Sequence, residues 1–154
     1  MGLAASAHGS IDTLKSPSTS TLIVTRRVHF NAAHRLHNPE LSDAENRRLF
    51  GLCNNANFHG HNYELDVSVE GTIDPTTGYV VDLGVIKRLV EERVTSKLDH
   101  RNLNLDVLEL AGTIPTTENL AVAIWRMLNG ALPGRLKKIV LWETPRNCVE
   151  YDGR

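Results

Sequence analysis

The segment HGHNYELDVSVE, residues 59–70, predicts a β-strand that carries two histidines. From Tyr63 onward, apolar and polar residues alternate, as is typical of a half-buried strand. Successive side chains of a strand point to opposite faces of the sheet. If the strand begins at His59, the imidazoles of His59 and His61 therefore share one face.

A third histidine, His34, ends another alternating run, over residues 22–34. An imidazole on an apolar strand face costs free energy unless a partner satisfies it, and a metal ion would be such a partner. Catalytic zinc typically has three protein ligands and keeps one position for water or substrate, whereas structural zinc has four. A His-x-His pair by itself is also compatible with plain surface hydrogen bonding. With His34 added, the sequence predicts that His34, His59 and His61 bind one zinc ion.

The composition favours a single globular domain. The chain has 154 residues, of which 23% are charged, and a formal net charge of -1, which gives no general attraction to nucleic acid or to an anionic membrane. No apolar run is long enough to span a membrane. Only two cysteines are present, so we expect free thiols and a cytoplasmic protein. Residues 1–20 are rich in small and polar residues and are predicted to be a disordered N-terminal tail, which leaves residues 21–154 as one catalytic domain.

The order of predicted elements indicates an α+β fold. The strand of residues 59–70 is followed by turn residues 74–78 and by an apolar stretch, residues 79–83, for which a hairpin is the simplest interpretation. Helices are expected over residues 85–98 and from Thr116 to about residue 129, and a short capped helix over residues 42–50. Strands near residues 138–144 and 148–151 complete a largely antiparallel sheet with two main helices on one face. Such a sheet has open edges, which favours oligomerisation.

Four further residues are candidates for chemistry. Cys53 is either a small buried apolar residue or a thiolate near the metal, and its predicted position in a loop favours the thiolate. Asp99 and His100 follow a helix, where a carboxylate can orient an imidazole. Glu143 shares strand parity with apolar neighbours, so its carboxylate is expected to be buried and to need donors such as the N–H groups of a heterocycle. The alternative is an ion-paired glutamate at the end of a sheet.

Several motifs occur together in one order. They are Phe30-Asn31-Ala32-Ala33-His34-Arg35-Leu36, Cys53-Asn54-Asn55, His59-Gly60-His61-Asn62-Tyr63, Leu98-Asp99-His100, Thr116-Thr117-Glu118-Asn119 and Trp142-Glu143-Thr144. With these motifs the chain resembles the 6-pyruvoyl-tetrahydropterin synthase family over roughly residues 22–152. The resemblance implies the tunnelling fold, in which subunits form trimers around a continuous antiparallel barrel and two trimers stack as a hexamer.

The resemblance also implies a reaction and a role for each motif. The substrate would be 7,8-dihydroneopterin triphosphate, and the product 6-pyruvoyl-tetrahydropterin, formed with elimination of triphosphate. His34, His59 and His61 look like the zinc ligands and Cys53 like the proton acceptor, with Asp99 and His100 as its relay. Glu143 looks like the pterin anchor, and Thr116, Thr117 and Glu118 are further expected substrate contacts. For the triphosphate, Arg35 is the first candidate and Arg27 a second one.

One position departs from the family pattern, and two rival functions stay open. Phe58 stands where a small residue is expected before the His-Gly-His pair. The related 6-carboxytetrahydropterin synthase has the same fold and zinc site, but its cysteine lies closer to that pair. Here five residues separate Cys53 from His59, which favours the pyruvoyl product. The rival of another class is a non-catalytic zinc-binding assembly module, which would not need Cys53, His100 and Glu143 together.

Overall fold

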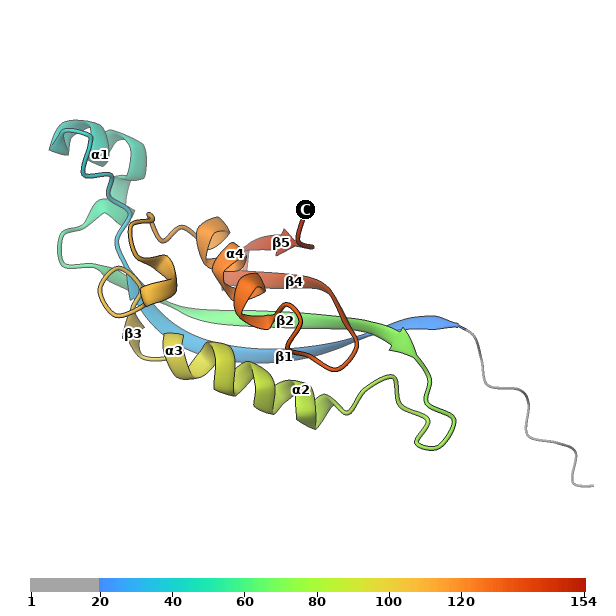
Figure 1. The fold of residues 1–154 in the computed structure, drawn as a ribbon. Coiled ribbons are helices and arrows are strands. Elements are labelled where there is room, and N and C mark those ends of the chain that lie inside the picture. The colour runs from blue at the N-terminus through green and yellow to red at the C-terminus, as the bar shows by residue number, and fades with distance from the viewer. Residues whose placement is uncertain (1–19) are drawn as a thin grey trace, which may run out of the picture.

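A five-stranded sheet forms the centre of the protein (Figure 1). The computed structural model describes residues 20–154, so residues 1–19 of the predicted tail lie outside the described residues. The order of strands is β3-β1-β2-β4-β5. β1, β2, β4 and β5 pair antiparallel with their neighbours, and β3 pairs parallel to β1 at Ala32 and Ala33. The strands are β1 (Thr21–His34), β2 (His59–Thr72), β3 (Arg101–Asn102), β4 (Arg135–Thr144) and β5 (Asn147–Tyr151).

The helices follow the predicted order. They are α1 (Asp43–Phe50), α2 (Leu83–Val90), α3 (Ser96–Leu98) and α4 (Thr117–Leu128). A π-helical turn, Glu91–Thr95, joins α2 to α3, so the predicted helix over residues 85–98 is continuous but irregular. Short 3-10 helices span Gly51–Asn54, named η1, and Leu108–Leu110. Thr116 caps α4, because its side chain accepts a hydrogen bond from the backbone N–H of Asn119.

The core lies between the helices and one face of the sheet. α2 packs on β1, and α4 packs on β4 and β5. Alternate residues of β2 are fully buried, as the alternating pattern predicts, and the same holds for the second half of β1. The buried hydrophobic strand residues are Val28, Phe30, Ala32, Tyr63, Leu65, Val67, Val69, Leu136, Ile139 and Leu141. The predicted α+β class with a largely antiparallel sheet is therefore confirmed.

The predicted start of α1 is also confirmed. The Ser42 side chain accepts from the backbone N–H of Glu45, and the Glu45 carboxylate accepts from the backbone N–H of Ser42. This reciprocal capping box satisfies two donors that would otherwise have no partner at the helix end. It fixes the start of the short segment that leads through η1 to β2.

The prediction of a hairpin strand over residues 79–83 was wrong. Both edges of β2 are already occupied, one by β1 and the other by β4, so no edge remains for a third partner. The turn is formed by hydrogen bonds between Asp74 and the residues Gly78 and Tyr79. The chain then enters α2 directly, because the Asp82 side chain accepts from the backbone N–H of Gly84 as an N-cap. Among residues 20–154, none of the helices has the length and apolar character that crossing a bilayer requires.

Candidate metal centre and its surroundings

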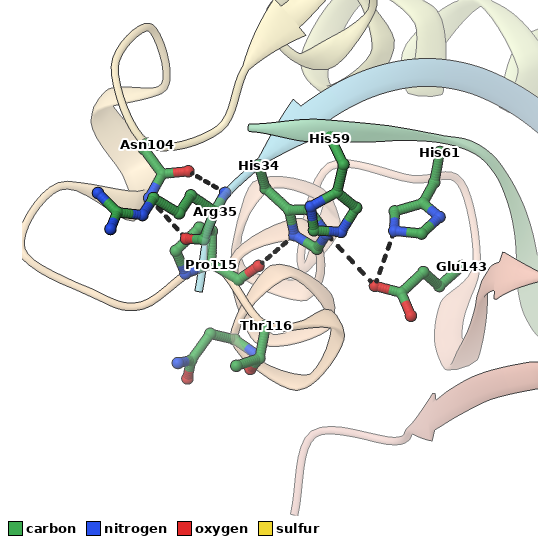
Figure 2. A network of polar contacts seen from close by, with 9 residues as sticks. His34, Arg35, His59, His61, Asn104, Pro115, Thr116 and Glu143 are labelled. Atoms are coloured by element: carbon green, nitrogen blue, oxygen red, sulfur yellow. Dashed lines mark hydrogen bonds and ion pairs between the residues drawn. The ribbon is translucent and has the colours of Figure 1, made fainter. Parts of the chain in front are cut away.

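His34, His59 and His61 meet at the end of the sheet where β1 finishes and β2 begins (Figure 2). His34 pairs directly with His59 in the sheet register, and His61 lies opposite Ala32. The Nε2 atoms of His34 and His59 are 3.0 Å apart. The ligand atoms of all three imidazoles lie within 4.8 Å of one another, a cluster that could hold one metal ion after small side-chain adjustments to zinc–nitrogen distances of about 2.0–2.1 Å.

Hydrogen bonding around the imidazoles fits a bound metal. Nδ1 of His34 lies 2.8 Å from the backbone carbonyl oxygen of Pro115, to which it can donate. In the neutral ring this fixes the tautomer and leaves the lone pair of Nε2 facing the other two histidines. Nε2 of His61 is buried and has no hydrogen-bond partner among residues 20–154. A cation between the rings would satisfy both nitrogens, so the three histidines are suited to zinc.

Burial keeps these histidines neutral. The pKa values of His34, His59 and His61 are all lowered, in each case mainly because burial disfavours the charged ring. Nearby histidines lower them further, and the carboxylate of Glu143 acts in the opposite direction. A neutral imidazole is the form that binds metal, so the site is prepared for a cation at neutral pH.

Metal-free protein is expected to lose stability as the pH falls below about 6.5, the ordinary pKa of histidine. Because the folded-state values are lowered, the unfolded chain binds more protons than the folded protein in this range. The free energy of unfolding therefore decreases as the pH falls. Thermal unfolding of chelator-treated protein between about pH 7.5 and 5.5 measures this, and His34→Gln should flatten the dependence. A midpoint that stays constant or rises toward acid pH would contradict the prediction.

The residue before the histidine pair is strained. Phe58 has a φ angle of 64°, in the left-handed region that residues with a side chain seldom adopt. Its backbone N–H donates to the carbonyl of Asn55, which closes the turn between η1 and β2. A phenylalanine therefore occupies a backbone conformation that favours glycine, at the position immediately before His59.

Glu143 reaches the histidines from β4. Its Oε1 atom lies 3.7 Å from Nε2 of His34 and 3.7 Å from Nε2 of His61 (Figure 2). Its carboxylate was expected to be buried, but 23% of the side chain is exposed. The reason is a register irregularity in the pairing of β4 with β5 between Trp142 and Thr144, which lies at this residue. One carboxylate oxygen therefore faces the imidazoles while part of the side chain remains open to an incoming ligand.

Cys53 lies in η1 rather than in an irregular loop, and it is partly buried. Its backbone carbonyl accepts from the N–H of Leu36, and the Asn54 side chain donates to the carbonyl of Leu36. These bonds connect the cysteine segment to the residues that follow His34. Burial and, second, the carboxylate of Glu143 raise the pKa of the Cys53 thiol. Without a nearby cation, the thiol is thus held in its protonated form.

Asp99 and His100 form an ion pair with each other and none with Cys53 among residues 20–154. Nδ1 of His100 is 3.0 Å from the Asp99 carboxylate, which also accepts from the backbone N–H of Asn31. The Asn31 N–H is the main reason that the pKa of Asp99 is lowered. The His100 side chain is 77% exposed, and within residues 20–154 no hydrogen bond or ion pair joins this pair to Cys53. The two residues form a carboxylate–imidazole pair at the edge of the sheet, separate from the thiol.

The two arginine candidates occupy different surroundings. Arg35 lines a hollow of about 400 Å³, and its Nε donates to the backbone carbonyl of Asn54. Asn104 holds the Arg35 backbone by accepting from its N–H and donating to its carbonyl (Figure 2). Arg27 instead lies on the face of β1 opposite to His34, where it binds the carboxylates of Glu64 and Asp66. Its charge is already compensated within the chain.

The N-terminus of α4 lies next to His34. Pro115, which accepts from His34, immediately precedes the cap residue Thr116 (Figure 2). Thr116 and Thr117 are partly buried, and Glu118 is exposed. Thr116 therefore lies near the three histidines, because the preceding residue, Pro115, is hydrogen-bonded to His34.

Sequence reasoning missed two residues of this region. Arg47 of α1 lines the same hollow as Arg35, and the basic pair at residues 47–48 was the available signal. Tyr63 lies next to His61 on the inner face of β2 and is fully buried. Its parity with the two histidines in the alternating segment could have indicated it.

Comparison with known proteins gives consistent results along the chain. The family model described as 6-pyruvoyl tetrahydropterin synthase matches residues 23–154. The 6-pyruvoyl tetrahydrobiopterin synthase of Homo sapiens is 50% identical over 131 residues, which cover 84% of this chain and 90% of that protein. A dihydroneopterin monophosphate aldolase of Pyrococcus furiosus is 37% identical over 128 residues, covering 82% of this chain and 93% of that protein.

Structural comparison agrees with the sequence matches. The solved 6-pyruvoyl tetrahydropterin synthase of Caenorhabditis elegans superposes with a TM-score of 0.82 at 42% identity, covering 88% of this chain and 97% of that one. The same relationship is thus found in the sequence, in the family model and in the fold. The chain belongs to the 6-pyruvoyl tetrahydropterin synthase family.

Proposed function

We propose that this protein converts 7,8-dihydroneopterin triphosphate to 6-pyruvoyl-tetrahydropterin with elimination of triphosphate, and that it uses zinc held by His34, His59 and His61. The observation that supports this most directly is the convergence of three neutral imidazoles with Glu143 at 3.7 Å from two of them. Family membership, with a curated relative named as such a synthase at 50% identity, supports the same reaction.

Each nearby residue has a role in this proposal. Zinc, when bound, supplies a Lewis acid that acidifies the C–H bonds next to the hydroxyl oxygens of the substrate. The Sγ atom of Cys53 accepts a proton from the substrate side chain. The carboxylate of Glu143 accepts hydrogen bonds from the ring N–H and amino groups of the pterin. Thr116, Thr117 and Glu118 line the substrate at the start of α4.

The test is identification by mass of every product formed from 7,8-dihydroneopterin triphosphate, with and without chelator. We expect 6-pyruvoyl-tetrahydropterin and triphosphate, loss of both with chelator, and recovery when zinc is returned. Release of acetaldehyde would instead identify a 6-carboxytetrahydropterin synthase. Zinc retention with no turnover would favour the non-catalytic assembly module.

Arg35→Ala is expected to raise the apparent KM for the triphosphate substrate by about tenfold to a hundredfold, and to leave turnover at saturation close to wild type. Charged hydrogen bonds to phosphate contribute about 1.5–3 kcal/mol each, and Arg35 lies in a hollow with a second arginine, Arg47. Arg48→Ala is the matched control, because Arg48 is an exposed arginine of α1 that does not line this hollow. Steady-state kinetics measures both variants, and an unchanged KM for Arg35→Ala would exclude the role.

The position of His100 supports an assembly in which active sites form between copies of the chain. Within one chain, no hydrogen bond or ion pair among residues 20–154 joins His100 to Cys53, so we expect a relay between them to join two subunits. β1 also offers an open edge, since among residues 20–154 it pairs on the side away from β2 only at Ala32 and Ala33. We propose that the β1 edge of one copy pairs with the β5 edge of the next, since only a contact between two different edges closes a trimer, and that two trimers stack as a hexamer.

Mixing two inactive variants tests this assembly. Cys53→Ala and His100→Ala should each lose most turnover, but a one-to-one mixture that is unfolded and refolded together should regain about one quarter of the wild-type sites by random association. Refolding each variant separately and then combining them is the control, and should regain none. Sedimentation velocity at micromolar concentration follows the assembly. A purely monomeric species, or no recovery in the co-refolded mixture, would contradict the prediction.

A further inference from the structure

Tyr63 has a buried hydroxyl that the proposed reaction has not used. The residue is 0% exposed, and its ring stacks on Phe30 with centroids 5.0 Å apart and an angle of 12° between the planes. Its hydroxyl group has no hydrogen-bond partner among residues 20–154. Leaving a buried hydroxyl unpaired costs free energy, so such a group needs an explanation.

The Tyr63 ring packs beside the histidine centre. The Tyr63 ring stands edge-on to the rings of His61, at 5.7 Å, and His34, at 6.4 Å. Burial, and then the nearby Glu143 and Cys53, raise the pKa of Tyr63. The phenol therefore lies beside two metal-binding candidates and within electrostatic range of the proposed pterin anchor and the proposed base.

The other unpaired buried groups are less informative. Arg26 Nε is also without a hydrogen-bond partner among the described residues, and Trp142 Nε1 interacts with the Asp66 carboxylate, but both belong to side chains that are only partly buried. His59 Nδ1 and His61 Nε2 belong to the metal centre itself. Tyr63 alone among these is a fully buried residue that is not a candidate metal ligand.

We propose that the Tyr63 hydroxyl donates a hydrogen bond to a hydroxyl oxygen of the side chain of the bound pterin, and so selects pterins with a hydroxylated side chain. This inference rests on the proposed function, since it assumes a pterin at the histidine centre. A neutral phenol can donate one hydrogen bond, and substrate oxygens held beside the imidazoles are acceptors. A site built to bond a substrate hydroxyl discriminates against the analogue that lacks it.

The experiment compares two non-reacting ligands on zinc-loaded protein by calorimetry. Neopterin carries the trihydroxypropyl side chain, whereas pterin lacks it. Tyr63→Phe removes only the hydroxyl, and Tyr151→Phe, which removes a phenol hydroxyl from a ring packed on Trp125, is the matched control. We expect Tyr63→Phe to weaken neopterin binding roughly tenfold and to leave pterin binding unchanged. Tyr151→Phe should change neither affinity.

Thermal unfolding of metal-free, ligand-free protein supplies a second measurement. Because the hydroxyl has no partner there, Tyr63→Phe is expected to keep the wild-type Tm or to raise it by about 2–4 °C. If the hydroxyl only stabilised the fold, Tyr63→Phe would lower the Tm. A lowered Tm, an unchanged affinity for neopterin, or equal weakening of neopterin and pterin would each overturn the proposal.

Failure of the proposed function gives a different result. If wild-type protein binds neither neopterin nor pterin, the proposed function fails and the role of Tyr63 fails with it. If wild-type protein binds both and Tyr63→Phe binds them equally well, the role of Tyr63 alone is overturned.

Discussion

Cys53→Ala should lower turnover by about a hundred- to ten-thousand-fold, the usual contribution of a general base, while zinc content stays at the wild-type level. The thiol is partly buried in η1 and is not one of the three imidazole ligands. Its loss therefore removes a proton acceptor without removing a ligand. Steady-state rates and metal analysis by mass spectrometry measure the two effects separately.

Cys148→Ala is the matched control for this prediction. Cys148 is exposed on β5, so the same chemical change there should leave turnover near wild type. Near-normal turnover of Cys53→Ala would exclude its role as the base. A parallel loss of zinc would instead identify the thiol as a metal ligand.

The acidity of the thiol should depend on the metal. In the metal-free protein, burial and Glu143 raise the pKa of Cys53, which opposes the thiolate that a base must be. A cation among the histidines adds positive charge close to the same carboxylate. The rate of alkylation by iodoacetamide, followed against pH, is expected to have a lower midpoint in the zinc-loaded protein. Equal midpoints would mean that another group must activate the thiol.

The sequence predicted that the three histidines converge because strand parity is a strong constraint. A slip of one residue in a strand moves every side chain to the other face, so the buried apolar residues of β1 and β2 fix where the histidines point. The pairing of His34 with His59 follows from the same register. Local patterns also identified the capping box of α1 and the Thr116 cap of α4, since each depends only on residues within one turn.

Features that depend on distant segments were not predictable in this way. Tyr79 and its neighbours have strand-like composition, but whether they pair depends on β4, which arrives late in the chain and takes the second edge of β2. The exposure of Glu143 depends on an irregularity in the pairing with β5. The separation of His100 from Cys53 depends on the path of β3 along β1. Each of these is a consequence of tertiary pairing, on which local periodicity carries no information.

The role of Glu143 determines whether the metal has an open position for the substrate. Its carboxylate lies 3.7 Å from two imidazole nitrogens, so it could anchor the pterin ring or complete a four-ligand metal site. A fourth protein ligand would close the position that substrate needs, since catalytic zinc keeps one position open. The exposed part of the side chain favours the anchor, because it leaves the carboxylate accessible to a ligand.

Glu143→Gln is therefore expected to retain zinc and to weaken neopterin binding by about a hundredfold. The amide replaces an oxygen that accepts a charge-assisted hydrogen bond with an NH₂ group, which faces a donor of the pterin instead of accepting from it. His61→Ala is the contrasting variant, because it removes one of the three imidazoles and should lose the metal as well as the ligand. Zinc analysis and calorimetry on the same samples separate the two roles. If Glu143→Gln loses zinc as His61→Ala does, the carboxylate is a ligand, the centre has four protein donors, and the substrate must react without direct access to the metal.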